Sequence, residues 1–127
     1  MRMTEYTHNW IKRSEEDFLV ADILLREDGP PNTICFHLQQ AAEKLLKAFL
    51  SYKGKHVRKI HELDALVSEC AKLESSFIEL RDDAFYLTKF YTETRYPGDL
   101  PIFSKQDAEQ AYKHADKIRS FVEKFLK

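Results

Sequence analysis

Residues 33–53, TICFHLQQAAEKLLKAFLSYK, decide the fold class of this chain. Apolar residues recur there at three- and four-residue spacing, as they do on one face of an α-helix. Gly54 follows at the position where a helix commonly ends with a glycine in the left-handed conformation. We therefore predict an amphipathic helix over residues 33–53, with Asn32 as its N-terminal cap.

Four more stretches outside this one have helical periodicity. The first, about residues 5–27, places Trp10 and Phe18 on one side. A capping box at Ser76–Glu79 predicts the start of another helix, and Ser104 with the residues after it predicts the cap of the last. The expected helices are residues 5–27, 33–53, about 63–73, 76 to about 91, and from Ser104 to about 125.

The composition agrees with a helical fold. The chain has 127 residues, of which only 3 are Gly and 4 are Pro, too few for the many tight turns of a β-sandwich or barrel. Apolar residues make up 43% and charged residues 32%, which is typical of a folded domain and not of a disordered chain. We predict a single domain over residues 1–127, an all-α, up-and-down antiparallel bundle of about five helices.

Several functional classes are excluded by what the sequence lacks. No charge-free run is long enough to cross a bilayer and no signal peptide is evident, so a cytoplasmic location is the default expectation. The two Cys residues form neither a disulfide framework nor a zinc motif, and we expect Cys35 and Cys70 to be buried. The His spacing indicates no metal site, and no Gly-rich phosphate loop or GxSxG motif occurs.

Positive charge is concentrated between Lys44 and His61, although the net charge of the chain is −1. This segment contains six Lys or Arg residues, two His residues and no Asp or Glu. It is where we expect an anion to bind.

A polar stripe runs along the predicted helix 33–53. Phe36, Gln40, Glu43 and Lys47 follow one another at spacings of four, three and four, so they share one face. One interpretation is an ordinary Glu43–Lys47 ion pair on a solvated face. The other is a groove between helices, with Glu43 as a base or ligand and Lys47 as a phosphate partner. The pattern leaves both open.

The segment Arg95-Tyr96-Pro97-Gly98 forms a second candidate. Pro followed by Gly fits the central positions of a type II turn. Arg95 could bond the last carbonyls of the preceding helix, or it could bind a phosphate with Tyr96 as a stacking face.

Asp17 and His61 are weaker candidates. Asp17 lies on the apolar side of the first helix, so we expect an ion pair with Arg95 or Lys44 and favour a structural role. His61 precedes the third helix, where a His is more often a cap or a packed side chain than a catalyst.

Taken in order, several segments resemble the HEPN domain, a small helical bundle of prokaryotes that also occurs in higher eukaryotes. The resemblance covers nearly the whole chain. It is carried by the segments Phe36–Leu50, Lys59–Leu63 and Thr94–Pro97, together with Trp10, Asp17 and Ala21.

The resemblance implies one of two activities. One branch of the family contains metal-independent endoribonucleases, marked by an Arg and a His with four to six residues between them near the last helices; Arg95 has no such His after it. The other branch, with an Arg-Tyr-Pro loop, accompanies minimal nucleotidyltransferases and is similar to the C-terminal helical domain of kanamycin nucleotidyltransferase. This chain matches the second branch better.

We therefore expect a homodimeric protein, without a cofactor, that binds a nucleotide or phosphorylated substrate and works with a separately encoded nucleotidyltransferase in a toxin–antitoxin-like pair. Glu43 is the candidate base for an acceptor hydroxyl. The expected ligand-binding residues, with Gln40 orienting the ligand, are Gln40, Lys44, Lys47, His61, Arg95 and Tyr96. The alternatives are a metal-independent endoribonuclease with a degenerate site, with RNA as its substrate, and a non-catalytic helical interaction module.

Overall fold

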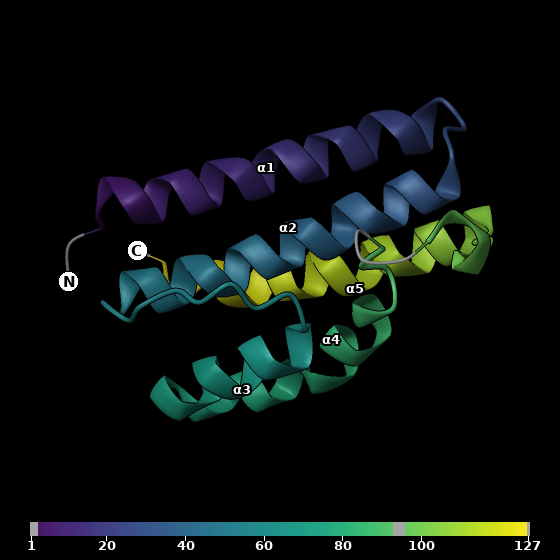
Figure 1. The fold of residues 1–127 in the computed structure, drawn as a ribbon. Helices are drawn as coiled ribbons and strands as arrows, with labels where there is room; N and C mark the ends of the chain where they lie inside the picture. The colour runs from purple at the N-terminus through teal and green to yellow at the C-terminus, as the bar shows by residue number, and fades with distance from the viewer. Residues whose placement is uncertain (1–2, 93–95, 127) are drawn as a thin grey trace.

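The computed structural model describes residues 3–92 and 96–126, which form five α-helices and two short 3-10 helices and contain no β-strand (Figure 1). The all-α, up-and-down bundle predicted above is confirmed. The elements in chain order are α1 (Glu5–Arg26), α2 (Pro31–Tyr52), α3 (Leu63–Leu73), η1 (Ser75–Leu80), α4 (Arg81–Thr88), η2 (Pro97–Asp99) and α5 (Lys105–Glu123).

Helix α2 is the centre of the bundle. It packs against α1 along its length, with α5 and α3 against its other sides (Figure 1). Most of its residues are buried, including polar ones such as Gln39 and Glu43. A helix that is apolar over most of its circumference lies in an interior, which explains why residues 33–53 decide the fold.

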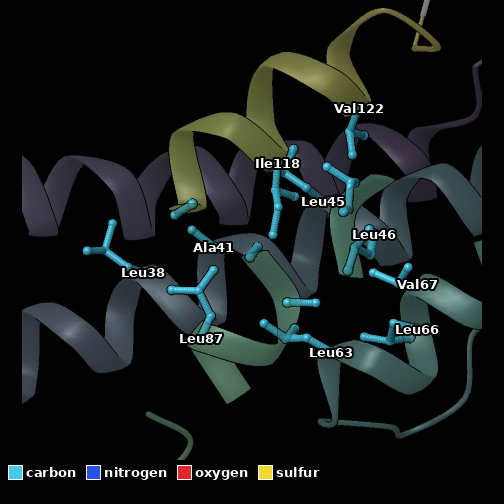
Figure 2. Close-up of a cluster of buried hydrophobic side chains, with 14 of the residues drawn as sticks. Leu38, Ala41, Leu45, Leu46, Leu63, Leu66, Val67, Leu87, Ile118 and Val122 are labelled. Atoms are coloured by element: carbon cyan, nitrogen blue, oxygen red, sulfur yellow. The ribbon is translucent and has the colours of Figure 1, made fainter. Parts of the chain in front are cut away.

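The main core contains side chains of all five α-helices, and Figure 2 shows the part of it between α2, α3, α4 and α5. Helix α2 contributes Leu38, Leu45 and Leu46, and α5 contributes Ile118 and Val122. Figure 2 shows that α3 and α4 complete this cluster from the other side. The apolar seam of α5 is therefore used inside the domain.

The start of α2 differs from the prediction. Pro30 occupies the capping position and Pro31 lies in the first turn, where a missing N–H costs nothing because it would have no helical partner. Asn32 is therefore not the cap, and its amide binds the segment before α5 instead. Its Nδ2 donates to the Pro101 carbonyl at 2.8 Å, and its Oδ1 accepts from the Phe103 N–H at 2.8 Å.

Two other local predictions are wrong. Residues 75–80 form the 3-10 helix η1 without a side-chain cap, because the Ser76 hydroxyl donates to Glu74 at 2.9 Å. The Pro97-Gly98 step is not a type II turn: that turn needs a positive φ at its glycine, and Gly98 has none. It belongs to η2, whose Asp99 N–H donates to the Tyr96 carbonyl at 2.9 Å.

The predicted ends at Gly54 and Ser104 are confirmed. Gly54 has a φ of +74°, and its N–H donates to the Ser51 carbonyl at 2.9 Å. The Ser104 hydroxyl accepts from the Asp107 N–H at 3.1 Å, and the Asp107 carboxylate accepts from the Ser104 N–H at 2.8 Å, which completes a capping box.

Candidate functional site

Glu43 and Lys47 form a buried ion pair on the face of α2 predicted to be polar. Their exposed fractions are only 3% and 4%, and Lys47 Nζ lies 2.9 Å from Glu43 Oε2. The interpretation of a solvated surface pair is therefore wrong. A charge pair is removed from water only at a cost, which its neighbours must offset with further hydrogen bonds.

The two glutamines before Glu43 supply such bonds. Gln40 Nε2 donates to Gln39 Oε1 at 2.7 Å, and the Nε2 atoms of both glutamines lie 3.4 Å from Glu43 Oε1. Gln39 Nε2 also donates to the His61 carbonyl at 3.1 Å. The glutamines therefore connect the carboxylate of α2 to the segment between α2 and α3.

His61 completes this cluster and extends it toward solvent. Its Nδ1 lies 3.2 Å from Glu43 Oε2, and its ring stacks on Tyr91 with 4.5 Å between centroids and 11° between planes. The His61 side chain is 43% exposed, whereas that of Glu43 is 4% exposed. Because Nδ1 faces the carboxylate, Nε2 is the ring nitrogen left for a ligand.

We call Gln39, Gln40, Glu43, Lys47, His61 and Tyr91 the Glu43 cluster. It unites four predicted site residues, namely Gln40, Glu43, Lys47 and His61. The sequence did not indicate the parts played by Gln39 and Tyr91. The helix predicted from residue 76 to about 91 ends at Thr88, so Tyr91 lies beyond it, and its proximity to His61 had no signal in the sequence.

Lys44 lies outside the Glu43 cluster. Its Nζ contacts Asp17 Oδ2 at 2.6 Å, and the other oxygen of this nearly buried carboxylate lies 2.8 Å from His37 Nδ1. The predicted Asp17–Lys44 pair is therefore confirmed, and it ties α2 to α1.

Two predicted ligand-binding residues remain, Arg95 and Tyr96. Arg95 lies outside the described residues. Tyr96 is 79% exposed and caps η2, and none of the described contacts joins it to Glu43 or His61. Their part in a ligand site stays a prediction.

The cysteines are inert. Cys35 and Cys70 are buried, as predicted, and burial raises the pKa of each thiol to about 12. The thiolate, which is the reactive form, is therefore negligible at neutral pH. Within residues 3–92 and 96–126, no three His, Cys, Asp or Glu side chains gather as metal ligands would. No helix in the same ranges is long and apolar enough to cross a membrane.

Comparison with known proteins identifies the family of this chain. The family model of the HEPN domain matches residues 7–125. The chain belongs to the HEPN domain family. The resemblance described above is therefore confirmed.

Individual HEPN relatives cover nearly the same length. The chain is 32% identical to a candidate toxin, MJ1304 of Methanocaldococcus jannaschii, over 97% of this chain and 90% of that protein. The crystal structure of TT1696 from Thermus thermophilus superposes with a TM-score of 0.83 at 28% identity, covering 95% of this chain and 98% of that one. ST0689, described as an archaeal HEPN homologue, superposes with a TM-score of 0.76 at 25% identity over both full chains.

Besides His37, which contacts Asp17, His114 is another histidine of the described residues that is held by a buried carboxylate. His114 Nδ1 of α5 lies 2.8 Å from Asp83 Oδ1 of α4, and Lys117 Nζ lies 3.3 Å from the other oxygen. His114 stacks on Tyr86 with 4.3 Å between centroids. The side chain of His114 is 29% exposed, less than that of His61, so His61 is the better placed of the two to meet a ligand.

Proposed function

We propose that this HEPN domain binds a nucleotide or another phosphorylated substrate at the Glu43 cluster and works with a separately encoded nucleotidyltransferase in a toxin–antitoxin-like pair. The observation that carries the proposal is His61, whose partly exposed ring is oriented by a buried carboxylate and stacked on Tyr91. A histidine held in this way presents one nitrogen in a defined direction, as general acid–base chemistry and phosphate binding both require.

We assign a different role to each member of the Glu43 cluster. Glu43 contacts His61 Nδ1 and so fixes the tautomer and orientation of the ring, and we therefore place Glu43 behind the histidine and not on the acceptor hydroxyl. Lys47 compensates the negative charge of Glu43 through their ion pair. His61 Nε2 is the group that meets the phosphoryl oxygen or removes the acceptor proton.

The segment of sequence after Tyr91 would supply the remaining ligand contacts. Tyr91 stacks on His61, and Arg95 and Tyr96 follow it by only a few residues in the chain. In this proposal the Arg95 guanidinium donates two hydrogen bonds to the phosphate, and the ring of Tyr96, which is 79% exposed, stacks on the ligand.

The relative MJ1304 supports the proposed toxin-type role. MJ1304 bears the name of a candidate toxin and aligns over 97% of this chain. We assign the chain the same type of role, with the nucleotidyltransferase as its partner. A small nucleotidyltransferase encoded in the neighbouring reading frame would support this partnership.

Calorimetric titration of ATP and AMP, at low and high salt, tests the binding site. We expect salt-sensitive binding that is weakened about tenfold or more in His61→Ala and in Arg95→Ala, because each removes a charge-assisted bond. His8→Ala, which removes an exposed histidine of α1, is the matched control and should bind as wild type does.

Two results of the titration would contradict the proposal. Binding that is unchanged in both variants would show that the Glu43 cluster is not the site. Absence of binding, with and without the nucleotidyltransferase, would favour a non-catalytic interaction module.

A further inference from the structure

A hollow of about 390 Å³ lies between α1 and α2, on the α1 side of the Glu43 cluster. Tyr6, Asn9, Trp10 and Arg13 of α1 line it at three- and four-residue spacing, and Lys44 lines it from α2. We call it the α1–α2 pocket. No carboxylate is among the side chains that line it, although α1 carries five Glu and Asp residues.

The pocket has an aromatic wall formed by Tyr6 and Trp10. Tyr6 is 54% exposed and meets Trp10 edge to face, with 5.9 Å between centroids and 78° between planes. The Trp10 Nε1 atom is shielded from solvent and has no hydrogen-bond acceptor among the described residues. The indole is thus held without a hydrogen bond from its N–H, and two aromatic rings at a surface hollow form a platform for a planar ligand.

The charge in the pocket is positive. Arg13 is exposed and forms no ion pair with any described residue. Lys44 contributes an ammonium group that Asp17 holds in place at 2.6 Å. An arginine without a carboxylate partner is suited to a phosphate, because its planar group donates two parallel hydrogen bonds.

The Glu43–Lys47 ion pair connects the pocket to the Glu43 cluster, because Trp10 of the pocket contacts Lys47. Lys47 Nζ lies 5.5 Å from the centroid of the Trp10 ring and 2.9 Å from Glu43 Oε2. Glu43 in turn contacts His61 at 3.2 Å. Trp10 and His61 therefore lie on either side of the same buried pair, which places the two sites next to each other.

From this arrangement we infer that the α1–α2 pocket binds the nucleobase and a phosphate of a nucleoside phosphate, with the base against Tyr6 and Trp10 and the phosphate on Arg13 and Lys44. The inference rests on the proposed function and narrows its ligand, because a phosphorylated compound without a base would leave the aromatic wall unused.

Trp10 reports on this pocket directly, since it is the single tryptophan of the chain. The experiment follows Trp10 fluorescence and heat in parallel while AMP, adenosine, ribose 5-phosphate or inorganic phosphate is added. AMP should change the fluorescence and bind about tenfold or more tightly than ribose 5-phosphate or inorganic phosphate, because only AMP has both a base and a phosphate. Adenosine should bind more weakly than AMP, because it has no phosphate for Arg13.

Variants locate the site. Arg13→Ala should weaken AMP binding about tenfold or more, and Tyr6→Ala should remove most of the preference for AMP over ribose 5-phosphate. Lys12→Ala is the matched control, because Lys12 is an exposed cation of the same helix turn that does not line the pocket. Both tested side chains are exposed, so their loss should leave the fold intact.

The outcomes separate this inference from the proposed function. If AMP binds and His61→Ala weakens it, while Trp10 does not respond and Arg13→Ala binds normally, the pocket assignment is wrong and the His61 site stands. Equal affinity for AMP and ribose 5-phosphate would also overturn the inference. If Arg13→Ala abolishes binding and His61→Ala does not, the pocket stands and the His61 site is wrong. Absence of any binding overturns both.

Discussion

Lys47 places an ammonium group in the interior of the bundle, where its exposed fraction is 4%. The charge is tolerated there because Glu43 lies 2.9 Å away and is itself bonded by Gln39, Gln40 and His61. A spacing of four residues on a helix is the same for a surface pair and for a buried one. Only the packing of Trp10 over Lys47 and of His61 beside Glu43 distinguishes the two.

We therefore predict that Lys47→Met destabilises the domain by about 3 kcal/mol, because it leaves Glu43 buried with reduced compensation. The double variant Glu43→Leu, Lys47→Met should lose clearly less stability than the sum of the two single variants, since no buried charge remains. Urea unfolding of the wild type and the three variants measures this coupling. Strictly additive losses would show that the two side chains do not interact.

At the scale of elements, the ends of the helices are set by local chemistry that a sequence shows only in part. The Ser104 capping box and the Gly54 end were predictable, because each depends on residues a few positions apart. The start of α2 was not, since Asn32 binds Pro101 and Phe103, which lie about 70 positions further along the chain. Residues 76–79 have the pattern of a capping box but form a 3-10 helix, where the Ser76 hydroxyl binds Glu74.

The capping box of α5 should have a measurable effect on stability. Ser104→Ala should cost about 1 kcal/mol at neutral pH, because it removes the acceptor for the Asp107 N–H. Ser120→Ala, an exposed serine further along α5, is the matched control and should cost much less. Thermal unfolding of both variants provides the comparison, and equal effects would contradict the role of the cap.

The capping box of Ser104 and Asp107 also predicts that the stability of the protein depends on pH. The hydrogen bond from the Ser104 backbone N–H lowers the pKa of Asp107, so the folded state binds a proton on this carboxyl less readily than the unfolded chain does. Its stabilising contribution is present above the ordinary aspartate pKa and is lost as the pH falls through the lowered folded-state value. Asp107→Asn should therefore flatten the stability profile in acid, as measured by urea unfolding between neutral and acidic pH. A variant profile as steep as that of wild type would contradict this.

At the scale of the whole molecule, the apolar surface left over after folding bears on assembly. The seam of α5 and the rings of Phe77 and Phe90 are buried within the domain, so they are not available to a second copy. Phe85 of α4 is 79% exposed and Ile78 of η1 is 49% exposed, and both line one shallow hollow. This face therefore has exposed apolar side chains for contact with a second copy.

We predict a closed two-fold dimer, the commonest form of small homo-oligomers, through this face. Light scattering at micromolar concentration should return twice the chain mass of 15.0 kDa. Phe85→Ser should shift the protein toward the monomer. Ile102→Ser, which removes an apolar side chain that is 97% exposed on a loop, should not. A wild-type protein of 15.0 kDa would contradict the dimer.

We also predict no RNA cleavage above background in the presence of EDTA. The metal-independent ribonuclease branch of the family depends on an Arg–His pair near the last helices, and no His follows Arg95 at the required spacing. Loss of one positioned acid–base group typically lowers a rate by about 10²–10⁴. A gel assay with structured and single-stranded RNA provides the measurement. Cleavage that survives EDTA and disappears in His61→Ala would assign the chain to the ribonuclease branch.

The sequence by itself determined the helical class, the position of the central helix and the family, because apolar periodicity and a few ordered motifs are local properties of the chain. It also singled out Gln40, Glu43, Lys47 and His61. Tertiary structure alone decided that Glu43 and Lys47 are buried, that Lys44 turns to Asp17, and that Tyr91 stacks on His61. The aromatic and cationic side chains of α1 gather into a pocket only when α2 packs beside them. Burial and contacts between distant segments depend on how helices pack together, and no spacing along a single helix specifies that packing.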